Sequence, residues 1–138
     1  MRRPRITKQH YELLAELRHT LRGFQRFSRD AARAAGLTSQ QHQALLAIKG
    51  FPGRDYVSVG ELADRLKVRH NSAVGLVDRL ARSNLVRRTS SEVDRRRVEI
   101  RLSEGGEAKI ERLSAVHLRE LKLLGPGLRS LLKAMGGQ

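Results

Sequence analysis

The sequence contains no cysteine among its 138 residues, which excludes disulfide bonds, zinc sites built on thiolates and oxidant sensing through a thiol. Aromatic residues are also scarce, at 4%, so the chain lacks the stacking platforms that hold single strands or RNA loops. No apolar run approaches the length of a membrane span, and the N-terminal residues lack the apolar core of a signal peptide. We therefore expect a soluble, cytoplasmic protein.

Recognisable catalytic motifs are missing as well. No candidate nucleophile has a base at a familiar spacing, and no glycine-rich loop lies between a strand and a helix in a phosphate-binding pattern. The pair Gly105-Gly106 comes closest, but it falls in the first turn of an expected helix and lacks the other glycines and the lysine of such a motif. An enzyme is therefore the least favoured class of function.

Positive charge is what the chain has in excess. Its 28 lysines and arginines stand against 14 acidic residues, which gives a formal net charge of +14. So strong a positive balance in a single domain of this size suggests a polyanionic partner, and nucleic acid is the first candidate. Arginine dominates over lysine, and its planar fork suits both phosphate and guanine.

Two short amphipathic helices are predicted in the middle of the chain. The first spans 59–66, with Ser58 as its N-cap and Glu61 completing a capping box. The second spans about 71–83, and its apolar residues recur at helical spacing. Because only residues 67–70 separate the two helices, they form a helix-turn-helix, whose second helix can enter a DNA major groove.

A basic hairpin is expected directly after this motif. Its strands are 86–89 and 98–102, and the second alternates apolar and charged residues with the period of a half-buried strand. The segment SSEVDRRR between them is polar and charged, as the tip of a hairpin should be. Val57 fits a short strand that could pair with this hairpin. A helix-turn-helix followed by a basic hairpin is a winged helix.

Longer helices are expected on both sides of this unit. Their ranges are about 7–35, 39–48, 104–124 and 128–135. Gly125-Pro126-Gly127 is expected to break the chain sharply between the last two. The leucines of the terminal helices exceed what a small winged domain needs to cover itself, which favours a dimer.

The expected architecture is therefore one domain over residues 1–138, mainly α with a small β-hairpin wing. Residues 7–35 and 103–138 are expected to form dimerisation helices, and residues 38–102 to form a DNA-binding lobe. A two-fold dimer of this kind reads a two-fold DNA site.

The same stretch resembles a known family. Leu62-Ala63, the run VRHNSAVGLVDRLARSNLVRR and the run DRRRVEIRLSEGG are similar to the multiple antibiotic resistance regulator (MarR) family. The most specific part is Asp94-Arg95-Arg96 ahead of an alternating strand that ends at Leu102-Ser103. The resemblance covers most of the chain. It implies a dimeric transcription regulator, usually a repressor, that a small aromatic or phenolic ligand releases from DNA by binding between the dimer helices and the DNA-binding lobe.

Candidate DNA contacts lie on the second helix of the motif and in the hairpin. Residues near the N-terminus of a recognition helix reach base edges, so Arg69 could read a guanine and Asn71 an adenine. Asp94 would repel phosphate, so its expected role is to hold an arginine side chain by a charge-assisted hydrogen bond. The resemblance assigns that partner as Arg96, which would enter a minor groove. The candidate set is Arg69, His70, Asn71, Ser72, Val74, Arg79, Arg82, Arg87, Asp94, Arg95, Arg96 and Arg97.

Histidines and aromatic residues are the candidates for small ligands. The sequence has no HxxxH pair, and its histidines are scattered over several helices, so neither a metal site nor a cofactor is predicted. The effector pocket that the resemblance implies could involve His19, Phe24, Phe27, His42 or His117.

Two classes of function remain after these steps. The favoured one is a sequence-specific, double-stranded DNA-binding regulator that acts as a homodimeric repressor on a palindromic operator. The alternative is a basic winged-helix module that binds RNA or a protein partner without operator specificity. The Asp-Arg-Arg hairpin favours duplex DNA, and the low aromatic content argues against single-stranded RNA.

Overall fold

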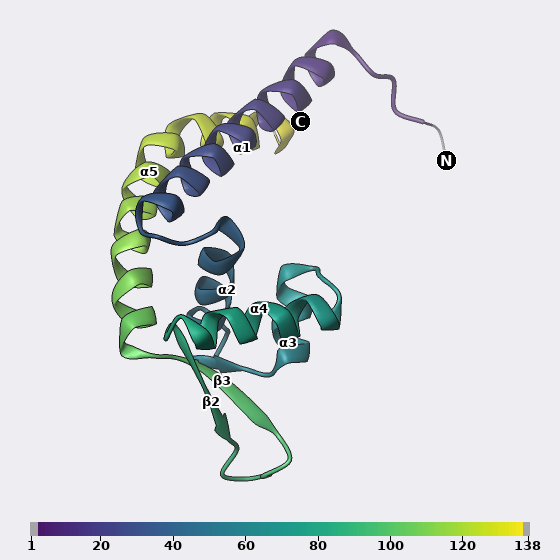
Figure 1. The fold of residues 1–138 in the computed structure, drawn as a ribbon. Coiled ribbons are helices and arrows are strands. Elements are labelled where there is room, and N and C mark those ends of the chain that lie inside the picture. Colours follow the sequence, from purple (N-terminus) through teal and green to yellow (C-terminus); the bar gives the residue numbers. More distant parts are fainter. Residues whose placement is uncertain (1–2, 137–138) are drawn as a thin grey trace.

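The computed structural model describes residues 3–136, which form a lobe of short elements and a long helical arm (Figure 1). In chain order the elements are α1 (Lys8–Ala34), α2 (Ser39–Lys49), β1 (Tyr56–Val57), α3 (Val59–Leu66), α4 (His70–Arg82), β2 (Val86–Ser90), β3 (Val98–Leu102) and α5 (Glu104–Gly136). The expected fold class, mainly helical with a small hairpin wing, is confirmed.

The lobe is built around one apolar core. Leu45 and Ile48 of α2, Leu62 of α3, Leu76 of α4 and Ile100 of β3 are all fully or almost fully buried in it. The apolar stripe that the sequence predicts on the second helix of the motif is buried throughout, from Ala73 to Leu80. Burial of this stripe turns the opposite face of α4 toward solvent.

Side-chain caps place the helix starts where the sequence predicts them. Thr38 Oγ1 accepts a hydrogen bond of 3.0 Å from the Gln41 amide at the start of α2. Ser58 Oγ accepts from the Glu61 amide at 3.1 Å, and the Glu61 carboxylate accepts from the Ser58 amide at 2.9 Å, which completes the capping box of α3. Lys67 ends α3 in the left-handed conformation, with φ of 57°, so that α4 can begin at His70.

The three strands form one antiparallel sheet in the order β1-β3-β2. Val57 pairs with Ile100, as the expected short strand requires, and β2 pairs with β3 from Val86–Leu102 to Ser90–Val98. The turn between β2 and β3 projects away from the helices at the bottom of Figure 1. This hairpin is the wing.

The C-terminal helix corrects one expectation. Gly125-Pro126-Gly127 does not break the chain, because α5 continues through Pro126 to Gly136. An interior proline removes one hydrogen bond and clashes with the preceding turn, which bends a helix without having to end it. The ribbon of α5 bends along its C-terminal half (Figure 1). The apolar spacing of Leu121, Leu124, Leu128 and Leu131 runs across the proline and is the signal for one helix.

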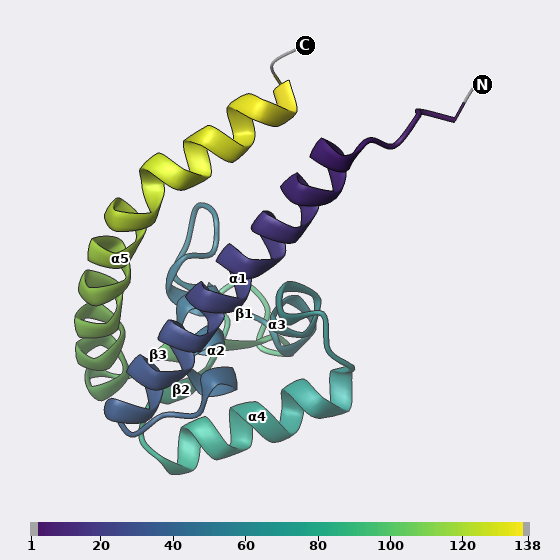
Figure 2. The ribbon, with the colours of Figure 1, turned by 90° about the horizontal axis from the view of Figure 1, so that it is seen from above.

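The arm consists of α1 and α5, which are in contact where Lys109 Nζ donates to the Ala35 carbonyl oxygen at 2.7 Å and where His117 Nε2 lies 2.9 Å from Ser28 Oγ. The two helices run in opposite directions, so that the start of α1 and the end of α5 lie together at the far end of the arm (Figure 2). Ala32 is the only residue of α1 that is fully buried within the described chain. Within residues 3–136, no helix has an apolar stretch of the length needed to span a bilayer.

Candidate nucleic-acid interface

The first turn of α4 presents a row of polar side chains to solvent. Arg69 is the N-cap residue, and within residues 3–136 its side chain makes no capping hydrogen bond to the amides of the first turn. Arg69, His70, Asn71 and Ser72 are exposed, and Val74 follows with 38% of its surface exposed. Free amides at a helix N-terminus favour anions such as phosphate, and the exposed side chains can reach base edges.

The second half of α4 adds two further cations. Arg79 and Arg82 are both exposed near its C-terminus, and Arg82 Nε donates to the Asp78 carbonyl oxygen at 3.4 Å. Their distance along the helix from the first turn suits contacts with the sugar-phosphate backbone more than with bases.

The six arginines between Val86 and Arg101 divide into two groups. Arg88 pairs with Asp78 of α4, and Arg101 pairs with Asp55 at 3.2 Å and Glu99 at 3.0 Å, so both are used inside the lobe. The other four are exposed and form no ion pair within residues 3–136. They are Arg87, Arg95, Arg96 and Arg97. These four are the hairpin arginines among the predicted DNA contacts.

Asp94 shapes the tip of the wing through the backbone. Its Oδ1 accepts a hydrogen bond of 3.0 Å from the Arg96 amide, and its carbonyl oxygen accepts one of 3.0 Å from the Arg97 amide. Among the described residues it does not pair with the Arg96 side chain, which corrects the expected contact. The physical reason is local: an Asp side chain readily reaches the amide two residues ahead and forms an Asx turn. Asp94 therefore stabilises the backbone conformation of the turn that carries Arg96.

The connection before α3 contains a stack that the sequence did not reveal. The Arg54 guanidinium lies over the rings of Phe51, at 4.5 Å, and Tyr56, at 4.8 Å, and it pairs with Glu61. The Arg101 guanidinium also lies over the Tyr56 ring, 4.3 Å from its centroid. Together these contacts join the helix-turn-helix to strand β3 of the wing. An arginine between two aromatic residues in a glycine-rich loop is the only sequence signal for this stack.

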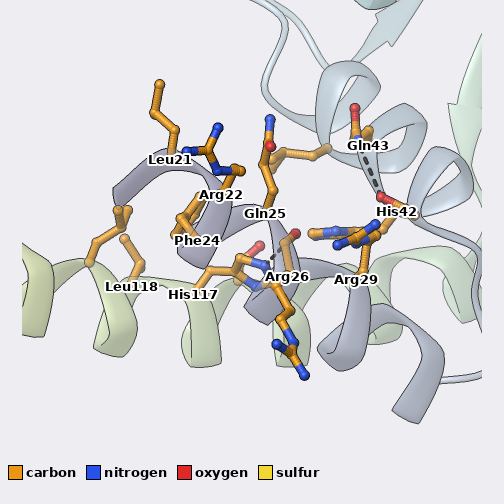
Figure 3. Close-up of a pocket in the computed structure, with 15 residues that line it drawn as sticks. Leu21, Arg22, Phe24, Gln25, Arg26, Arg29, His42, Gln43, His117 and Leu118 are labelled. Atoms are coloured by element: carbon orange, nitrogen blue, oxygen red, sulfur yellow. Dashed lines mark hydrogen bonds between the residues drawn. The ribbon is translucent and has the colours of Figure 1, made fainter. Parts of the chain in front are cut away.

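A separate cavity of about 970 Å³ lies where α1, α2 and α5 meet (Figure 3). Phe24, His42 and His117 from the predicted pocket set line it, together with leucines of the three helices. Phe27 lies beside it and contacts the His117 ring edge-on, with centroids 5.4 Å apart. His19 is exposed on α1 and does not line this cavity.

The two histidines of this cavity are in contact, with ring centroids 4.7 Å apart. His117 Nδ1 lies 2.6 Å from the Leu113 carbonyl oxygen, and its Nε2 lies 2.9 Å from Ser28 Oγ. His42 is only 3% exposed, and its Nδ1 has no hydrogen-bond partner in the described chain. Burial, and secondly the charge of His117, lower the pKa of His42 from its ordinary value. No group of three metal-ligating side chains gathers within residues 3–136.

Comparisons of the sequence and of the fold with known proteins both find similarity to the same family. Residues 35–97 match the model of the MarR family. The HTH-type transcriptional repressor MdtR of Bacillus subtilis (strain 168) is 31% identical over 80 residues, which are 58% of this chain. The aligned part is 50% of that repressor, so the chain spans about half the length of the curated relative that it matches.

Solved structures extend the similarity to nearly the whole chain. A MarR family protein from Bacillus stearothermophilus is 26% identical, with a TM-score of 0.77 over 96% of this chain and 99% of that chain. A MepR mutant of S. aureus, solved bound to an oligodeoxyribonucleotide, has a TM-score of 0.68 over 96% of this chain and 98% of that chain. At 18% identity, this second similarity concerns the fold alone. Residues 35–97 therefore match the MarR family in sequence, and the described chain has the winged helix-turn-helix fold of MarR family proteins.

Proposed function

We propose that this chain is a sequence-specific DNA-binding transcription regulator that acts as a homodimeric repressor on a palindromic operator. The proposal depends on one observation: the same lobe exposes both the uncapped first turn of α4 and the four arginines of the wing that form no ion pair within residues 3–136. The named function of MdtR as a repressor and the oligodeoxyribonucleotide bound to MepR support it. The family is one of regulators and not of enzymes, in agreement with the expectation from sequence.

The proposed contacts divide between the two grooves. α4 enters the major groove, where Arg69 and Asn71 read bases and Arg79 and Arg82 contact phosphates. The wing lies along the sugar-phosphate backbone of the DNA, and Arg96 at its tip enters the neighbouring minor groove. His70, Ser72 and Val74 complete the reading face of α4, and Arg87, Arg95 and Arg97 complete the phosphate contacts of the wing.

The arm supplies the proposed dimer interface. Several large apolar side chains are exposed on it, including Leu14 at 59%, Leu118 at 61% and Leu123 at 74%. Apolar surface of this amount on two adjacent helices is usually covered by another chain. A second copy, related by a two-fold axis, would cover the apolar side chains of α1 and α5 and leave the lobe of residues 38–102 free for DNA; residues 137 and 138 of the expected dimerisation segment lie outside the described residues.

The cavity between α1, α2 and α5 is the proposed effector site. It lies between the arm and the lobe, and its apolar lining with two imidazoles suits a small aromatic or phenolic compound. A ligand that prefers one orientation of the lobe changes the spacing of the two recognition helices in the dimer and so releases DNA.

Footprinting of the purified protein on sheared DNA from its own source tests the proposal. We expect protected sites with two half-sites about one helical turn apart, and a gel shift with such a site at physiological salt that matched duplex RNA does not give. Equal binding of RNA, or protection without a common sequence, would favour the alternative of a basic winged-helix module without operator specificity.

A further inference from the structure

One pair of imidazoles lies in contact where the lobe meets the arm. His42 comes from α2, a helix of the lobe, and His117 comes from α5 in the arm. His117 also contacts Ser28 of α1 through its Nε2 (Figure 3). Three helices from the two parts of the molecule therefore meet at a single pair of titratable rings.

The two rings differ in how they can carry a proton. The Leu113 carbonyl can only accept, so His117 Nδ1 is the donor of that bond. Ser28 Oγ can donate to Nε2 or accept from it, so His117 keeps both hydrogen bonds whether it is neutral or charged. His42 Nδ1 is buried without a partner, and a proton added to this ring has no acceptor nearby in the described chain.

The surroundings also oppose a second charge. On α1 the cavity is lined by Arg22, Arg26 and Arg29, on α2 only by uncharged residues besides His42, and on α5 by His117 with uncharged neighbours. No carboxylate lines the cavity in the described chain. Two imidazolium rings in contact, in a cavity whose lining includes three arginines and no carboxylate, repel one another.

We propose that the His42–His117 contact is a proton-sensitive latch between lobe and arm, and that acid pH opens it and weakens DNA binding. The proposal rests on the DNA-binding function proposed above. A proton on His42 is disfavoured in the closed contact, where the ring is buried beside His117, whereas a ring separated into water accepts one readily. The open arrangement therefore binds more protons and gains population as the pH falls.

The pH window follows from the direction of the shift. The pKa of His42 is lowered in the closed state from its ordinary value of 6.5, which an opened, hydrated ring would regain. The closed contact is therefore fully stable above this value and loses stability as the pH falls from it toward the lower pKa of the closed state. Binding at neutral pH is unaffected.

The test compares DNA binding of the full-length chain across pH with and without His42. His42→Phe removes the titrating ring and its unpartnered nitrogen, and His42→Gln removes the titration but keeps a polar group. The parent chain and both variants carry His70→Gln, so that the exposed histidine of α4 is absent from every sample that is compared. Fluorescence anisotropy with one duplex, from about pH 8 to about pH 5.5, gives the affinities.

We expect the parent to lose affinity below the ordinary range of histidine, by up to about tenfold per pH unit for each linked proton, and the two His42 variants to lose little. Parallel profiles of parent and variants would overturn the latch. Urea unfolding over the same pH range is a second readout that needs no DNA. If no variant binds DNA at any pH, the proposed function fails, and the latch stands only if acid destabilises the parent more than His42→Phe.

Discussion

Asp78 of helix α4 forms an ion pair with Arg88 of the wing strand β2. A carboxylate on the face that approaches DNA would repel phosphate, and the pair neutralises it. The same contact ties the element proposed to read the major groove to the element proposed to enter the minor groove. Both side chains are about half exposed, so the pair contributes no more than about 1 kcal/mol to folding.

The Asp78–Arg88 pair is expected to matter more for DNA binding than for stability. Asp78→Ala should change the free energy of unfolding by less than about 1 kcal/mol and yet weaken operator binding, because the wing loses its fixed distance from α4. The charge-swapped double variant, Asp78→Arg with Arg88→Asp, should bind better than either single change. Urea unfolding and anisotropy titration of the same samples measure both effects. Tighter binding by Asp78→Ala would show that the carboxylate only repels DNA.

The turn formed by Asp94 separates a hydrogen-bonding role from a charge role. Asp94→Asn keeps an oxygen that can accept from the Arg96 amide, so it should bind the operator nearly as well as the parent. Asp94→Ala loses that bond, and its more mobile wing should bind more weakly, because Arg96 must give up more freedom on entering the groove. If Asp94→Asn and Asp94→Ala bind the operator equally weakly, the carboxylate charge determines binding, as it would in the expected side-chain pair between Asp94 and Arg96. Titrations of both variants at one salt concentration decide this.

The first turn of α5 lies against the loop that ends α4. A Cβ added at Gly106 would overlap the Leu85 carbonyl oxygen, which also accepts a hydrogen bond of 3.0 Å from the Ser103 amide. Gly106→Ala should therefore destabilise the protein by about 1–3 kcal/mol through overpacking. The control is Gly23→Ala, where a Cβ meets open space within α1 and should stabilise by up to about 1 kcal/mol. Thermal unfolding measures both, and a neutral Gly106→Ala would show that α5 is not held at this contact.

The capping carboxylate of α3 predicts an acid-sensitive component of stability. Burial raises the pKa of Glu61, but hydrogen bonds from Ser58 and the charge and hydrogen bond of Arg54 outweigh it, so the net direction is down from 4.5. Stability from the ionised group is present above this value and is lost as the pH falls through the lower folded pKa. Glu61→Gln should be less stable at neutral pH by under about 1 kcal/mol, since the side chain is a third exposed. Urea unfolding at neutral pH and near pH 4 checks whether the difference shrinks on acidification.

Local chemistry made much of this fold predictable. The stripe of α4, the caps Thr38 and Ser58 and the alternation from Val98 to Leu102 each depend on neighbours a few residues away, and the structure has them where the sequence predicts. The break predicted at Pro126 was wrong. Proline disfavours a helix locally, whereas the apolar spacing on both sides of Pro126 continues one helix.

The contacts that join distant segments were not predictable in the same way. His42 and His117 are far apart in sequence and meet only because α2 packs beside α5. The bond between Asp78 and Arg88 likewise depends on how the wing folds back along α4. His19, a candidate for the pocket that the family resemblance implies, is exposed on α1 and lies outside this cavity. Residue type identifies candidates, but tertiary packing decides which of them meet.

The division of labour between α4 and the wing is the central claim, and one set of titrations tests it most directly. Asn71→Ala, Arg95→Ala and the parent are titrated against the footprinted operator, single-base variants of it and a scrambled duplex, at two salt concentrations. Asn71→Ala should lose roughly 1–3 kcal/mol of discrimination at one base position per half-site and keep the salt dependence. Arg95→Ala should weaken all duplexes alike and flatten the salt slope by about 0.9 for each lost phosphate contact. Identical behaviour of the two variants on every duplex would contradict the account.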